Sequence, residues 1–202
     1  MTPTPSYPSA AEIAESVAAA IAVLALGAAS AASGAMIPLL WGVDLGIHEF
    51  GHMVTYWVPV WQVTAAAGSV FQVAVPLGVA WYLAATRRYR TAGILLAWAG
   101  CSARNVAVYI GDAPYRQLAL IGGENSLHDW AQLLAGRQMQ YAGAIASAVN
   151  VLGWLLIAAG LVLAIAPVAM RVQAYWAHQR REAAFEVRRE SLPVREPHGP
   201  LG

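Results

Sequence analysis

The chain has 202 residues, of which 58% are hydrophobic and only 11% are charged. Soluble domains usually carry about 25% charged residues, so this composition argues against an ordinary soluble domain and favours a membrane protein. The formal net charge is only +1, which gives no indication of nucleic-acid binding, and the single cysteine excludes a disulfide framework within the chain.

Five apolar runs approach the roughly 20 residues that a helix needs to cross a bilayer: 11–30, 35–60, 69–85, 91–110 and 141–166. They predict an all-α, polytopic membrane protein with about five transmembrane helices. No Lys or Arg precedes the first run, so it lacks the basic region of a signal peptide and is expected to be a retained span. A Pro-rich, disordered lead is expected over residues 1–11 and the helical membrane domain over 12–170.

Arginine clusters predict the orientation of these spans. Arg87, Arg88 and Arg90 lie between the third and fourth runs, and more arginines follow the fifth run from Arg171 onward. With five spans both clusters lie on one side, which the positive-inside rule makes cytoplasmic. The N-terminus and the polar segment 111–140 are then expected to face outward. If the first run does not cross, only the N-terminus changes side.

The tail 171–202 is therefore expected in the cytoplasm. Apolar residues recur at helical spacing between Val172 and Val187, which predicts an amphipathic helix resting on the membrane or on a neighbour. A solvated, charged helix is the alternative. A Pro-rich, disordered end is expected to follow.

The second run contains HEFGH, an H-E-x-x-H pattern formed by His48, Glu49 and His52. Positions i and i+4 share a helix face, so the two imidazoles point to one place, as zinc binding requires. Glu49 could then take a proton from zinc-bound water as the catalytic base. Asp44, one turn earlier, could accept the outer N–H of His48. The alternatives are a hydrogen-bonded structural pair and a haem-binding pair, although two histidines on one helical turn cannot reach opposite faces of a haem.

A third zinc ligand is expected from the polar segment, because that segment and HEFGH fall on the same side of the membrane. His128 and Asp129 stand together near an expected helix start, with Ser126 as a candidate N-cap. We favour His128 as the ligand with Asp129 orienting it. Asp129 itself is the next candidate and Asp112 a further one, while a capped surface helix without metal is the alternative to all three.

Other polar residues interrupt the apolar runs. Gln72 and Asn105 could hold a substrate carbonyl near the metal, or they could form hydrogen bonds between helices, which we prefer. Arg104 is expected to pair with Asp112 or Glu124.

An H-E-x-G-H motif in a transmembrane helix resembles the site-2 protease family of intramembrane zinc metalloproteases. The resemblance implies His48 and His52 as zinc ligands, Glu49 as the catalytic base, and hydrolysis of a peptide bond in or near the membrane. The family's later motif, with Asn, Pro and Leu-Asp-Gly, has no good copy here, and no PDZ domain is present. The chain therefore resembles a small, divergent bacterial offshoot in the inner (plasma) membrane, with its site toward the outer side.

The expected function is that of a membrane-embedded zinc metallopeptidase. Its expected partners are membrane lipid and a membrane-anchored protein or peptide substrate. One alternative is a non-catalytic subunit that keeps a zincin-like metal site and associates with other membrane proteins in a larger complex. Another is a zinc hydrolase that acts on lipid or on a different amide.

Overall fold

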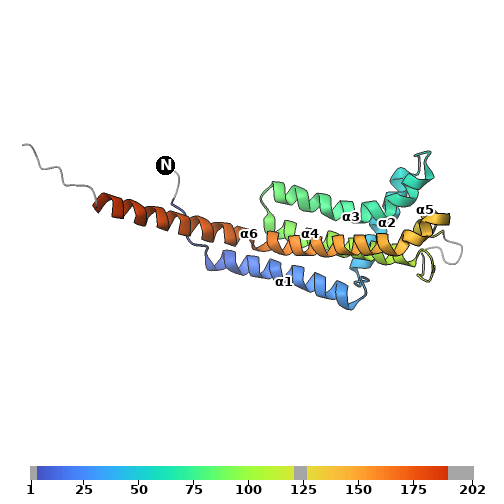
Figure 1. Ribbon diagram of the computed structural model, residues 1–202, viewed down its shortest axis with the longest axis horizontal. Coiled ribbons are helices and arrows are strands. Elements are labelled where there is room, and N and C mark those ends of the chain that lie inside the picture. The colour runs from blue at the N-terminus through green and yellow to red at the C-terminus, as the bar shows by residue number, and fades with distance from the viewer. Residues whose placement is uncertain (1–3, 121–126, 191–202) are drawn as a thin grey trace, which may run out of the picture.

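The computed structural model describes residues 4–120 and 127–190, and each regular element in these ranges is a helix (Figure 1). In chain order the elements are α1 (Ala10–Ala32), α2 (Leu40–Thr55), α3 (Trp61–Ala85), α4 (Tyr89–Asp112), α5 (Asp129–Leu133), the 3-10 helix η2 (Gly136–Tyr141) and α6 (Ala142–Glu190). This confirms the all-α prediction. Several predicted features lie outside the described residues: residues 1–3 of the lead, Glu124, Ser126 and the end 191–202.

Four helical segments are long and apolar enough to cross a membrane, which indicates an integral membrane protein: Ala10–Ala32, Trp61–Ala85, Tyr89–Asp112 and Gly136–Arg189. The prediction of about five spans is corrected at the second apolar run, which does not form a helix of that length. Gly34, Ala35 and Leu39 take positive φ in the turn after α1. This turn uses up the beginning of the run, and α2 retains only 16 residues, fewer than the roughly 20 that a crossing needs.

The beginning of α1 lies at the same end of the bundle as the turn between α3 and α4. Glu15 of α1 forms an ion pair with Arg90 at 2.6 Å, and Glu12 pairs with Arg171 of α6 at 3.0 Å. The expectation that the N-terminus lies opposite the arginines is therefore corrected. The reason is the count of crossings, because four crossing helices return the chain to the end at which it started.

Small residues let the central helices approach closely. A Cβ added at Gly93 of α4 would lie 2.4 Å from the Gly160 carbonyl oxygen of α6, and one at Gly100 would lie 2.5 Å from that of Gly153. Such contacts leave no room for any side chain and bring the two backbones together, as in other membrane bundles. On α1, a Cβ at Gly27 would lie 3.3 Å from Ile157.

Arg104 of α4 is partly buried between α1 and α6, and no acid in the ranges that the structure describes pairs with it. Its Nε donates to Asn150 Oδ1 at 3.1 Å, an Nη donates to Ser30 Oγ, and its guanidinium lies 4.1 Å from the ring centroid of Trp154. The expected pairing with Asp112 is therefore wrong. The cost of placing this charge in an apolar bundle is met by hydrogen bonds and an aromatic face.

Helix α6 runs the full length of the bundle and projects beyond it at the end where α1 begins (Figure 1). The expected tail helix is thus a direct continuation of the last span, although Pro167 lies within it. Trp176, Phe185 and Val187 of this projecting part are more than half exposed. Their apolar side chains are available to a membrane surface or a neighbouring protein.

Candidate metal centre

Two histidines on α2 and one aspartate on α5 meet at one end of the bundle. The cluster of Arg87, Arg88, Arg90 and Arg171 lies at the other end. One donor atom from each of His48, His52 and Asp129 lies within 4.8 Å of the other two. His48 is buried, and the other two are partly buried. The predicted pairing of His48 and His52 on one helical face is therefore confirmed, and a carboxylate completes a group that could hold a metal ion.

The orientation of both rings is set from behind by carbonyl oxygens of α3. His48 Nδ1 lies 3.2 Å from Gln72 Oε1, and His52 Nδ1 lies 2.8 Å from the backbone oxygen of Thr64. A carbonyl oxygen only accepts hydrogen bonds, so each neutral ring carries its proton on Nδ1. Both Nε2 atoms then present lone pairs, and each lies 3.3 Å from Oδ2 of Asp129.

This arrangement of donor atoms suits a cation. Two lone pairs facing a carboxylate oxygen repel it unless a proton or a metal ion lies between them. Bonds of about 2.0–2.1 Å in a tetrahedron place neighbouring donors about 3.3 Å apart, which matches the separation of each histidine nitrogen from Asp129 Oδ2. Burial alone would raise the pKa of Asp129, but its contact with His48 and His52, which could donate from Nε2 only when protonated, lowers this pKa to about 2, so the carboxylate is ionised.

The space beside the two imidazoles exists because residue 68 is a glycine. A Cβ added to Gly68 would lie 2.5 Å from Cδ2 and Nε2 of His48 and 2.6 Å from Nε2 of His52. Any side chain would therefore occupy the volume into which both donor nitrogens point. Gly51, which the HEFGH motif contains, has another role, because its missing Cβ lets α2 approach the Ala67 carbonyl of α3.

Asp129 is held in place by α3 and α4. Its backbone N–H donates to the hydroxyl oxygen of Tyr109 at 3.1 Å, and that hydroxyl donates to Asp129 Oδ2 at 3.3 Å. The next residue, Trp130, donates its indole N–H to Ser69 Oγ at 3.0 Å. The sequence analysis did not identify Gly68, Ser69, Tyr109 or Trp130 as site residues. Of these four, only Trp130 could have been found from the sequence, because it adjoins the His128–Asp129 pair.

The preference for His128 as the third ligand is corrected by the structure. Its Nδ1 accepts the backbone N–H of Ala131 at 3.3 Å, so this imidazole caps α5. Its Nε2 lies 3.4 Å from Asp112 Oδ2, at an angle that forms no hydrogen bond within the described residues, and the ring stacks on Tyr109. Burial lowers the pKa of His128 and favours its neutral form. The alternative candidate, Asp129, is the residue that joins His48 and His52 in the group that could hold a metal ion.

Asp112 also lies outside the group of His48, His52 and Asp129, called here the metal-ligating group because it could hold a metal ion. Its two carboxylate oxygens accept the backbone N–H groups of Gln117 and Leu118 at 2.9 and 3.0 Å. It therefore closes the turn that follows α4, a common use of an aspartate at the end of a helix.

The expected contact between Asp44 and His48 is also wrong. Asp44 is buried, and its carboxylate accepts hydrogen bonds from Trp98 Nε1 at 2.8 Å and Ser102 Oγ at 3.0 Å, both on α4. The outer nitrogen of His48 meets Gln72 instead. Asp44 thus holds α2 against α4. The contact with the outer nitrogen of His48, which we expected from the Asp44 carboxylate, is made by the uncharged amide of Gln72.

Gln72 and Asn105 form a chain of hydrogen bonds between helices, which agrees with the preferred interpretation that they bond helices together and do not hold a substrate. Gln72 Nε2 donates to Asn105 Oδ1 at 2.8 Å, and Asn105 Nδ2 donates to the Ala35 carbonyl at 3.2 Å. This chain fixes which end of the Gln72 amide faces His48. The loop after α1 is thereby connected to the orientation of a donor ring.

The metal-ligating group opens into a cavity of about 650 Å³ that Glu49 also lines. Glu49 is exposed, in contrast to the buried His48 next to it. The cavity walls are largely apolar and include Met36, Trp41, Leu45, Leu118 and Leu127. A second hollow, of about 420 Å³, shares His52, Leu127 and Asp129 with the first. His52 and Asp129 therefore border both hollows, and His48 borders the larger one.

No protein-family model, curated protein or solved structure matches this chain. Evidence for its function therefore comes from the geometry of the candidate site and from the motif that forms it.

Replacing Gln72 with leucine is expected to weaken metal binding. The change keeps a side chain of similar size but removes the oxygen that fixes the His48 ring, and losing such a supporting partner typically costs about 10–100-fold in metal affinity. Competition with a chelator of known affinity would measure the change. Gln62→Leu, at an exposed position on the same helix, is the matched control, and equal affinities for the two variants would contradict the assigned role of Gln72.

Proposed function

We propose that this chain is a membrane-embedded zinc metallopeptidase that hydrolyses peptide bonds of membrane-associated substrates, similar in its motif to the site-2 protease family. The observation that carries the proposal is the convergence of both Nε2 atoms on Asp129, with Glu49 one residue from the first ligand. Two imidazoles and one carboxylate are a known catalytic zinc set.

The chain supplies the remaining parts of a hydrolytic site. A zinc ion held there would polarise a scissile carbonyl and make a coordinated water more acidic. Glu49 lines the same cavity, where its carboxylate would accept a proton from the attacking water and pass it to the leaving amine. Gln72 and the Thr64 carbonyl keep the ligand nitrogens directed at the metal throughout.

The form of the cavity supports a substrate that is extended and apolar. Its walls combine large apolar side chains with the polar metal-ligating group, so a peptide segment leaving the bilayer could lie against them. By the positive-inside rule the end that carries Arg87, Arg88 and Arg171 faces the cytoplasm. The metal centre then lies toward the outer side of a bacterial plasma membrane, and both termini lie on the cytoplasmic side.

Metal analysis of two neighbouring variants tests the assignment of the third ligand. We expect purified wild-type protein and His128→Asn, which keeps a side chain able to cap α5, to hold about one equivalent of zinc. Asp129→Asn keeps the shape of the side chain but loses its negative charge, and it is expected to lose most of the metal. Equal zinc in the two variants would contradict the assignment. Iron in place of zinc would change the proposed metal and reaction, because two histidines and a carboxylate also bind ferrous iron.

A further inference from the structure

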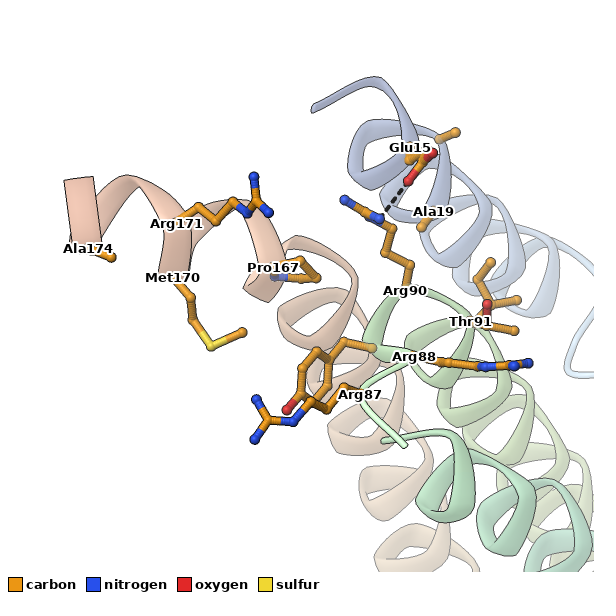
Figure 2. Close-up of a pocket in the computed structure, with 13 residues that line it drawn as sticks. Glu15, Ala19, Arg87, Arg88, Arg90, Thr91, Pro167, Met170, Arg171 and Ala174 are labelled. Atoms are coloured by element: carbon orange, nitrogen blue, oxygen red, sulfur yellow. Dashed lines mark hydrogen bonds and ion pairs between the residues drawn. The ribbon is translucent and has the colours of Figure 1, made fainter. Parts of the chain in front are cut away.

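A third hollow, with a different chemistry, lies at the end of the bundle where α3 turns into α4, and Figure 2 shows the residues that line it. It measures about 1100 Å³ and is bounded by α1, by the beginning of α4 and by the part of α6 around Pro167. Four arginines line it, from two separate parts of the chain: Arg87, Arg88 and Arg90 around the turn between α3 and α4, and Arg171 on α6. Glu15 is the one carboxylate in its lining.

Two of the four arginines are already held by α1. Arg90 forms an ion pair with Glu15 at 2.6 Å, which Figure 2 shows, and it also donates to Ser16 Oγ at 2.9 Å and to the Glu12 carbonyl oxygen at 3.0 Å. Arg171 pairs with Glu12 at 3.0 Å. These bonds make a fixed frame and neutralise two of the guanidinium groups.

The other two arginines are left without a counter-charge. Arg87 and Arg88 are exposed, and neither has a carboxylate partner in the parts of the chain that the structure describes. Arg87 has a φ of 61°, a left-handed conformation that is unusual for a residue other than glycine. In addition, α4 begins at Tyr89 without a side-chain cap, so the positive end of its dipole faces the same region.

Apart from Tyr89 and Thr91, the rest of the lining is apolar and comes from the spans themselves. It includes Ala18, Ala19, Ile94, Pro167, Met170 and Ala174. Arg87 and Arg88 follow directly on the end of α3, a helix that is long and apolar enough to span the bilayer. In a bilayer that α3 crosses, they would stand near the lipid phosphates, with an apolar wall beside them for acyl chains.

We propose that this hollow binds the headgroups of anionic phospholipids, with Arg87 and Arg88, whose side chains extend in opposite directions in Figure 2, as separate phosphate ligands. A guanidinium group donates two parallel hydrogen bonds to phosphate oxygens, and basic pockets between spans on the cytoplasmic side suit anionic headgroups. Each unpaired guanidinium matches a phosphate that carries one negative charge. A zwitterionic lipid, which has no net charge, would gain much less.

The test compares lipid retention by two double variants that lose the same charge. Wild type, Arg87→Gln/Arg88→Gln and the control Arg116→Gln/Arg137→Gln are purified and exposed to equimolar phosphatidylglycerol and phosphatidylcholine in detergent. Arg116 and Arg137 are exposed and lie outside the hollow, and Arg116 also has a positive φ, of 55°. Native mass spectrometry is expected to show retained phosphatidylglycerol on wild type and control, and about 30-fold less on Arg87→Gln/Arg88→Gln.

Inorganic phosphate provides the second arm of the test. If phosphate at millimolar concentration raises the unfolding temperature as phosphatidylglycerol does, and only when Arg87 and Arg88 are present, the site serves free phosphate. If phosphatidylglycerol alone does so, the source is lipid. Equal retention by the two double variants, or equal retention of the two lipids by wild type, would overturn the proposal. Size-exclusion chromatography and circular dichroism report folding. The single variants Arg87→Gln and Arg88→Gln, each expected to retain about 5-fold less phosphatidylglycerol, replace the double variant if it does not fold.

Discussion

Replacing Glu49 with glutamine is expected to abolish peptide hydrolysis and to leave the metal in place. Glutamine has nearly the same shape as glutamate but cannot accept a proton, and loss of a general base typically costs about 10²–10⁴-fold in rate. The carboxylate is exposed in the cavity and is not among the three grouped donors. The measurement is turnover of a membrane-anchored peptide substrate together with bound zinc. Turnover should fall while the zinc content stays unchanged.

The same experiment separates the enzyme from the alternative of a non-catalytic subunit. Glu186→Gln, an exposed change on the projecting part of α6, provides the control and should retain both zinc and activity. A Glu49→Gln variant as active as this control would exclude Glu49 as the base. A wild-type protein that binds zinc but cleaves no membrane substrate, and that copurifies with fixed partners, would favour the subunit.

Replacing Gly68 with alanine should prevent metal binding altogether. The new methyl group would lie about 2.5 Å from the rings of His48 and His52, well inside van der Waals contact, so at least one imidazole would have to leave its position. Its hydrogen bond to Gln72 or to Thr64 would be lost with it. Zinc titration followed by calorimetry is expected to show no high-affinity site.

Gly78→Ala on the same helix is the matched control, because a Cβ at that position meets nothing within 4 Å. Alanine is the better helix former by about 1 kcal/mol, so both variants should keep α3 intact. A Gly68→Ala protein that bound zinc like the control would show that the two imidazoles do not point toward this glycine.

The metal-ligating pair could be predicted because its geometry is local. Two histidines four residues apart share a face on any regular helix. The third ligand depends on how α5 docks, and there neighbouring donors compete for roles. His128 faces the end of its own helix and caps it, which leaves Asp129 toward α2. Nothing in the order of the two residues decides between these outcomes.

The remaining differences have the same origin in tertiary packing. Asp44 lies one turn from His48, yet Trp98 and Ser102 of α4 attract its carboxylate. Gly68 matters only because α2 packs directly over it, and an isolated glycine in an apolar run gives no sign of this. The span count differed because hydropathy cannot show that a tight turn shortens one apolar run.

The histidine and aspartate donors are far apart in the sequence, since His48 and Asp129 are separated by 81 positions. A bound ion would therefore cross-link the first half of the polypeptide to a segment synthesised much later. During biosynthesis this linkage could close only after α3 and α4 had been threaded and α5 had emerged. Metal loading would then be possible only in a chain whose insertion of α3 and α4 is complete.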